Sequence, residues 1–234
     1  MPARLAVAFF LECAYALFTR TWLRAHFSGV ELELWITGWR VASAAVYWLL
    51  FRDLLSAAAR NREAALAPVP APAPRSRLWL AAGIVTLMMV PLLFYGGYPE
   101  NSFYRVVFAL TSVVVAVREE VFYRGVIQSL LAKRFGFAVA LVASNIIFVL
   151  YHYGAQPLHL VGITEIFAIG CVLGLIYRAT GTLLAPIALH AAYDAMWSLG
   201  PIITPLPDIA RIPFHLLGAT LVLVGGSADI RTRA

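Results

Sequence analysis

The residues of this sequence that could do chemistry are ionisable side chains inside long hydrophobic runs. The first group is Glu119-Glu120, followed by Arg124. On a helix, Glu120 and Arg124 lie on one face, four residues apart with the acid first, which suits an ion pair. Glu119 points about 100° away from Glu120, so we expect it to lack a partner within its own helix. Such a carboxylate suits general acid or base catalysis, and the structural alternative is a salt-bridge cluster.

Two histidines and an aspartate form the second group. His152 ends the apolar run that contains Phe148, and His190 precedes Asp194 by four residues, so these two share a helix face. Each histidine alone could be a hydrogen-bonded core residue. Together with Glu119, however, they could converge from three helices on one water-filled cavity. There a Glu and a His would polarise a water, and the second His with a polar neighbour would stabilise an oxyanion.

The same side chains are possible zinc ligands. The candidates are Glu119, His152, His190 and Asp194. Carboxylate and imidazole groups are the ligands of zinc hydrolases, but the sequence lacks the His-Glu-x-x-His pattern of helical zinc sites. We therefore expect no cofactor, with zinc-dependent hydrolysis as the alternative. Glu165, in the next hydrophobic run, is a weaker candidate that could line the same cavity or a helix interface.

In order and spacing, these groups resemble the CPBP family of CAAX endopeptidases and bacteriocin-processing (Abi) intramembrane proteins. The resemblance covers residues 78–200 and rests on Glu119-Glu120-x-x-x-Arg124, Phe148-x-x-x-His152 and His190-x-x-x-Asp194. It implies an all-helical membrane core with a cavity open to one membrane face. It also implies an intramembrane endopeptidase that cleaves a peptide bond near a substrate's C-terminus or at a leader peptide. In this family the pair corresponding to Glu120 and Arg124 would brace the site.

The resemblance also implies catalytic roles. Glu119 would activate water with His152, and His190 and Asp194 would form the oxyanion side. The family usually has Asn at the last position, where this chain has Asp194. An ionised Asp cannot donate a hydrogen bond to an oxyanion. Asp194 is therefore protonated, or it only orients His190, or it favours the zinc alternative.

Composition places these residues in a membrane. The 234 residues are 62% hydrophobic and 13% charged, with a mean hydropathy of +0.81, whereas a soluble domain carries about a quarter charged residues. The segments long and apolar enough to span a bilayer are 4–19, 34–51, 78–95, 103–131, 136–152, 160–177, 182–199 and 212–226. The sequence thus predicts an all-α, polytopic transmembrane bundle of about eight helices.

A Pro-, Ala- and Arg-rich stretch at residues 57–77 divides these spans. Such a composition is typical of an extended, solvated linker. It separates two N-terminal transmembrane helices (1–56) from the catalytic membrane core (78–200). A last transmembrane helix and a tail follow at 201–234.

The net charge of +6 does not indicate a nucleic-acid partner, because the arginines lie mainly between hydrophobic runs. The expected partners are membrane lipid and a peptide or protein substrate, and the sequence leaves the oligomeric state open. The Ala- and Arg-rich composition favours a bacterial inner membrane, where a leader or C-terminal sorting signal is a better candidate substrate than a prenylated protein. The alternative from another class is a non-enzymatic binding or transport protein, but the sequence lacks the internal repeats typical of transporters.

The distribution of Lys and Arg predicts the orientation. If the linker is cytoplasmic, eleven fall in inside segments: Arg4, Arg52, Arg60, Arg62, Arg75, Arg77, Lys133, Arg134, Arg178, Arg231 and Arg233. Four fall in outside segments: Arg20, Arg24, Arg105 and Arg211. Because cytoplasmic loops carry the excess of positive charge, both termini are expected in the cytoplasm.

Reporter fusions test this orientation. Fusions at the N-terminus, after Ala65 and at the C-terminus should all report from the cytoplasmic side, because the spans between them are even in number. A fusion after Ala65 that reports from outside would invert the topology.

Overall fold

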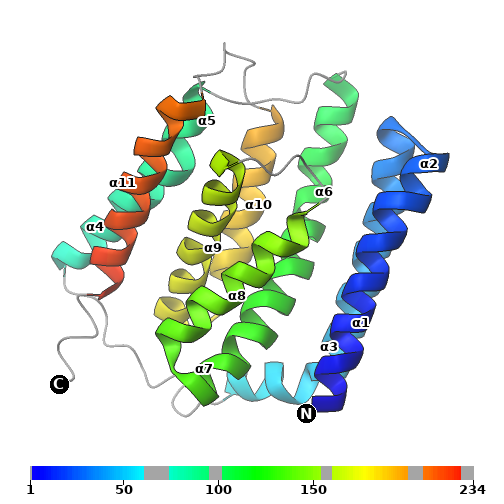
Figure 1. Ribbon diagram of the computed structural model, residues 1–234, viewed down its shortest axis with the longest axis horizontal. Coiled ribbons are helices and arrows are strands. Elements are labelled where there is room, and N and C mark those ends of the chain that lie inside the picture. Colours follow the sequence, from blue (N-terminus) through cyan, green and yellow to red (C-terminus); the bar gives the residue numbers. More distant parts are fainter. Residues whose placement is uncertain (1, 61–73, 95–101, 154–159, 200–207, 228–234) are drawn as a thin grey trace.

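The computed structural model describes residues 2–60, 74–94, 102–153, 160–199 and 208–227. Helices account for nearly all of these residues and pack side by side as one bundle (Figure 1). This confirms the predicted all-α fold.

Within the described residues, eight helical rods lie at the expected segments. The first is α1 (Pro2–Phe18), continued by the π-helical η1 (Thr19–Leu23) and by α2 (Arg24–His26). The second and third are α3 (Gly29–Arg60) and the run α4 (Pro74–Ile84), η2 (Val85–Met89) and α5 (Val90–Phe94). The fourth is α6 (Ser102–Glu120), η3 (Val121–Gln128) and α7 (Ser129–Phe135). The others are α8 (Phe137–His152), α9 (Leu160–Thr180), α10 (Leu184–Leu199) and α11 (Asp208–Ser227).

Helix covers both ends of the predicted linker. α3 continues to Arg60 and α4 begins at Pro74, which suits the first turn of a helix because proline lacks an N–H to donate there. The middle of the linker, residues 61–73, lies outside the described residues.

The bundle has the inside-out polarity of a membrane protein. Large apolar side chains such as Phe10, Leu110 and Leu184 are more than two-thirds exposed, whereas Arg118, Glu120 and Arg124 are almost fully buried. Four described helices are long and apolar enough to cross a membrane: Ala3–His26, Gly29–Ser56, Arg75–Leu92 and Leu160–Thr180. Two more, Phe137–His152 and Ile212–Gly225, are apolar but shorter. The protein is therefore an integral membrane protein with charged side chains buried inside its bundle.

The rods form three groups across the bundle (Figure 1). The N-terminal hairpin of α1 and α3 lies at one side, and α4, α5 and α11 lie at the other. Between them stand α6, α8, α9 and α10. α1 begins and α11 ends at the same edge of the bundle, while the turn between α2 and α3 lies at the opposite edge.

A buried ion pair fixes the N-terminal hairpin to the central helices. Arg118 on α6 donates to Glu12 Oε2 on α1 at 2.5 Å, and Tyr47 and Tyr123 donate to the same carboxylate. The remaining guanidinium nitrogens of Arg118 donate to Ser43 Oγ and to Tyr151 Oη, each at 2.9 Å. The hydrogen bonds satisfy both charges, so the pair can stay buried.

Removing one charge of this pair should destabilise the fold. Glu12→Ala leaves Arg118 buried without its counter-charge, which costs about 3–5 kcal/mol in comparable cases. We therefore expect a lower melting temperature for Glu12→Ala than for the double variant Glu12→Leu/Arg118→Met, measured by thermal unfolding in lipid nanodiscs. Glu31→Ala is the control, because Glu31 is exposed. A Glu12→Ala protein that melts like the Glu31→Ala control would contradict the anchoring role.

Candidate active site

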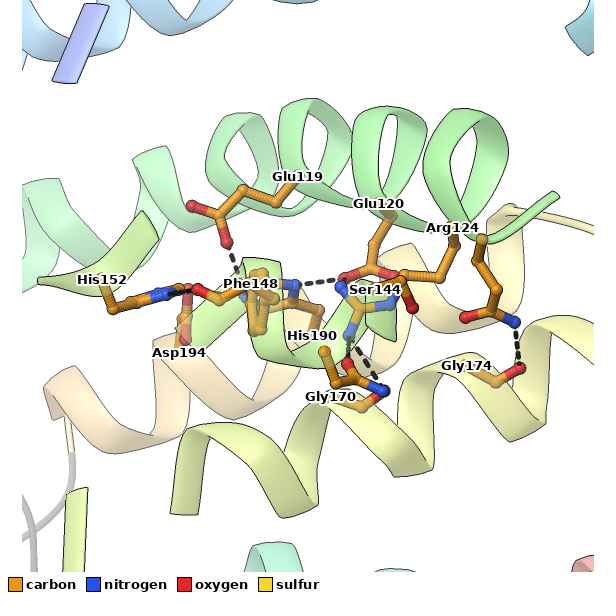
Figure 2. Close-up of polar contacts among 12 residues, drawn as sticks. Glu119, Glu120, Arg124, Ser144, Phe148, His152, Gly170, Gly174, His190 and Asp194 are labelled. Atoms are coloured by element: carbon orange, nitrogen blue, oxygen red, sulfur yellow. Dashed lines mark hydrogen bonds and ion pairs between the residues drawn. The ribbon is translucent and has the colours of Figure 1, made fainter. Parts of the chain in front are cut away.

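A cavity of about 320 Å³ lies within the bundle. It is lined from α3, α6, α8, α9 and α10, and its walls include the four predicted residues, Glu119, His152, His190 and Asp194. Figure 2 shows them approaching one another from α6, α8 and α10. The expected convergence of three helices is thus present, and Glu165 lines the same cavity.

Glu119 carries the least satisfied carboxylate of the site. Its side chain is buried, and its Oε2 accepts no hydrogen bond from any described residue. His190 Nε2 lies 3.9 Å from this oxygen, which is too far for a direct hydrogen bond. The carboxylate of Glu119, which lines the cavity, thus has unused hydrogen-bonding capacity with which it can bind a water.

Glu120 makes the expected ion pair and one contact that the sequence did not indicate. Arg124 Nη1 donates to Glu120 Oε1 at 3.1 Å, which confirms the pair predicted from their spacing. His190 Nδ1 lies 2.7 Å from the same oxygen. The spacing on α10 had suggested Asp194 as the partner of His190, but Asp194 Oδ2 lies 3.6 Å from Nε2. Glu120 therefore orients the imidazole, with Nδ1 donating and Nε2 directed between Glu119 and Asp194.

Arg124 ties this pair to two further helices. Its Nη2 donates to Asn145 Oδ1 on α8 at 3.3 Å and to the carbonyl oxygen of Gly170 on α9 at 3.0 Å. A Cβ on Gly170 would overlap the Asn145 side chain, so only glycine permits this approach. One turn further along, Gln128 Nε2 donates to the carbonyl oxygen of Gly174 at 3.1 Å. These contacts lock α6, α8 and α9 together around Glu120.

Asn145, Gln128 and the two glycines support the site, although the sequence-based prediction did not include them. A signal for them was available, since Gly170 and Gly174 form a small-x-x-x-small pair, a pattern that lets membrane helices approach closely. Polar amides within apolar helices likewise mark interhelical contacts.

The backbone between Glu120 and Gln128 is π-helical rather than α-helical. In η3, which follows Glu120, every described side chain from Phe122 to Gln128 is buried. Ser129 Oγ donates to the Arg124 carbonyl oxygen five residues earlier, at 3.0 Å. Widened turns of this kind are frequent at functional sites. Here the widened turn brings Arg124 and Gln128 to two successive turns of α9.

His152 stands at the C-terminal end of α8. Its Nδ1 lies 2.8 Å from the carbonyl oxygen of Phe148, which can only accept, so Nδ1 is the donor and Nε2 is the free nitrogen. Arg20, on η1, donates to the carbonyl oxygens of Tyr151 and Tyr153 on either side of His152. A cation at the C-terminal end of a helix satisfies carbonyl groups that have no partner within the helix. The N-terminal hairpin thus holds the end of α8 that carries His152.

The arrangement suits acid–base chemistry. The carboxylate of Glu119 has an unpaired oxygen, and the imidazole of His152 has a nitrogen that can accept a hydrogen bond. A second imidazole, that of His190, is oriented by Glu120. Over the ranges that the structure describes, no three His, Cys, Asp or Glu side chains converge as the ligands of a metal ion would. The geometry therefore supplies a base and a hydrogen-bond donor facing one space.

One family model matches part of the chain. Residues 100–196 match the family model described as Rce1-like, type II CAAX prenyl endopeptidase. The matched range contains Glu119, His152, His190 and Asp194, while α1 and α3 lie outside it. No curated protein and no solved structure matches the chain.

Removing Arg124 should unfold the protein as well as impair its activity. Arg124→Ala leaves Glu120 and the Gly170 carbonyl oxygen without their partner, at a cost of about 3–5 kcal/mol. The amount of folded protein, measured by size-exclusion chromatography and thermal unfolding, should fall. Arg134→Ala, at an exposed position on α7, is the control. An Arg124→Ala protein that melts like wild type yet is inactive would make Arg124 a substrate contact instead of a brace.

Proposed function

We propose that this chain, in which residues 100–196 form an Rce1-like CAAX-protease region, is an intramembrane endopeptidase that hydrolyses a peptide bond by activating water with Glu119 and His152. The observation that carries the proposal is the carboxylate of Glu119, which lines the same cavity as His152 and His190 and whose Oε2 has no hydrogen-bond donor among the described residues. The substrate is a peptide segment of a membrane-associated protein that is cleaved near one of its ends.

The hydrogen-bonding roles of these side chains support the following steps. A water donates one hydrogen bond to Glu119 and the other to Nε2 of His152, the nitrogen left free by the bond to Phe148. Glu119 takes a proton as the water oxygen attacks the peptide carbonyl carbon. The protonated Glu119 then gives that proton to the leaving amine as the C–N bond breaks. The products are a new carboxyl end and a new amino end.

His190 is suited to stabilise the oxyanion of this reaction. When both of its nitrogens are protonated, Nδ1–H donates to Glu120 and Nε2–H is left to donate to the oxyanion. Asp194 Oδ2, 3.6 Å from Nε2, favours the positive charge on His190 without competing as a direct hydrogen-bond acceptor. We assign Asp194 this electrostatic role, and on this account it need not be a donor like the family's Asn.

The cavity lies toward the end of the bundle where α2 meets α3. Its lining includes Arg24 and Leu32 near that turn, and Tyr104 near the start of α6. With both termini in the cytoplasm, this end would face the outer side of the membrane. A leader or sorting signal of an exported protein is then the substrate class that fits the proposal.

Replacing the base should abolish cleavage without unfolding the protein. We expect Glu119→Gln to lower the cleavage rate by about 100-fold or more, the usual cost of losing a general base, while its melting temperature stays near that of wild type. Glu31→Gln, at an exposed position that does not line the cavity, is the control. The readout is the set of protein termini that appear in membranes only when the active protein is present. Normal cleavage by Glu119→Gln would remove this residue from the mechanism.

Zinc content distinguishes the two forms of hydrolysis. We expect purified protein to contain substoichiometric zinc, and to keep its activity after chelation and dialysis. Asp194→Asn removes one possible ligand and should change neither the zinc content nor the response to chelator. One zinc per chain, with activity lost on its removal and regained on its return, would make the enzyme a metalloprotease.

A further inference from the structure

Arg40 brings a cation to the cavity from outside the matched region. It stands on α3, and its side chain lines the same cavity as Glu119 and His190. It lies close enough to Glu119 and Asp194 to interact with both electrostatically. The proposed mechanism assigns no role to this residue.

One edge of the Arg40 guanidinium is held in place by the protein. Nη1 donates to Glu33 Oε1 at 2.5 Å. The same oxygen also accepts from Thr37 on α3 at 3.3 Å and from Thr111 on α6 at 2.9 Å. Glu33 is itself buried, so two helices fix the position of this carboxylate and, through it, of the cation.

The other edge of the guanidinium faces the cavity. The described residues provide no hydrogen-bond acceptor for Nε or Nη2 of Arg40, and neither atom is sealed off from the open space. The side chain as a whole is only 16% exposed. Two parallel N–H donors presented in a sheltered place match the two oxygens of a carboxylate.

A peptide cleaved near its C-terminus supplies such a carboxylate. Three extended residues span about 10 Å, and Glu119 and Arg40 both line the cavity in which such a segment would lie. At about 320 Å³, the cavity has the size of a small-ligand site. It thus accommodates a short peptide end.

We propose that Arg40 binds the C-terminal carboxylate of the substrate through Nε and Nη2, and so selects peptide bonds at a set distance from a chain end. This inference rests on the proposed function for its substrate class. It makes Arg40 a specificity-determining residue and Glu33, with Thr111, its positioning group.

Peptide binding tests the subsite separately from catalysis. The probe is a labelled peptide pool that ends in Cys, two aliphatic residues and a variable residue, with and without S-farnesylation. Each peptide is made both as the free acid and as the C-terminal carboxamide. Affinity is measured by fluorescence anisotropy with Glu119→Gln protein in phosphatidylcholine nanodiscs, where no cleavage removes the probe.

We expect the free acids to bind about 10- to 100-fold more tightly than the carboxamides, as a charge-assisted, two-point contact provides. Arg40→Gln should abolish this preference and leave carboxamide binding unchanged, while Arg40→Lys should keep part of it. Arg134→Gln, exposed on α7, is the matched control. If Arg40→Gln does not fold because Glu33 is left unpaired, Glu33→Gln/Arg40→Gln restores the charge balance and serves in its place.

The outcomes separate the two proposals. Equal affinities for acid and carboxamide, including no measurable binding of either, overturn the subsite. The subsite is also overturned if the acid preference is lost when phosphatidylglycerol is added and Arg40→Gln abolishes this sensitivity to the lipid. In that case Arg40 binds a lipid headgroup. An acid preference that depends on Arg40, without cleavage of the free acids by wild-type protein, upholds the subsite and overturns the proposed function.

Discussion

The structure depends on keeping Glu120 charged where no water reaches it. This side chain is fully buried, and it stays tolerable because Arg124 and His190 both donate to Oε1. An ion without partners in such surroundings would cost several kcal/mol. The need to satisfy Glu120 and Arg124 together brings α6, α8, α9 and α10 to one point. The same constraint that stabilises the bundle therefore orients the imidazole of the proposed oxyanion site.

Glu119 and Glu120 have different surroundings because adjacent residues of a helix point in different directions. Glu120 faces the charged partners of the interior, and Glu119, rotated by about 100°, faces the cavity with an oxygen that no described residue binds. Two adjacent residues of one type thus receive different surroundings. Glu120 accepts two hydrogen bonds at Oε1 and has a structural role, whereas Glu119 retains the capacity to bind and deprotonate water.

The N-terminal hairpin belongs to the site although it lies outside the matched region. Arg20 binds the carbonyl groups on either side of His152, Glu12 pairs with Arg118 one residue before Glu119, and Arg40 lines the cavity. Through these contacts the hairpin supports two of the proposed catalytic residues, Glu119 and His152. A hairpin that fastens and lines the matched core is a natural place for differences in ligand choice to arise, since it can vary without altering Glu119 or His152.

The sequence by itself determined the helical segments, the inward placement of the charges and the Glu120–Arg124 pair, because hydropathy and an i,i+4 spacing are local properties of a chain. It also singled out Glu119, His152, His190 and Asp194, which are among the residues that line the cavity. Only the tertiary structure decided that His190 binds Glu120, 70 residues away, and that Arg118 binds Glu12, 106 residues away. Those partners depend on the rotation and depth of each helix, and here on a π-helical turn that shifts Arg124 and Gln128 onto α9. No local pattern encodes that rotation, since it is set by how the helices pack against one another.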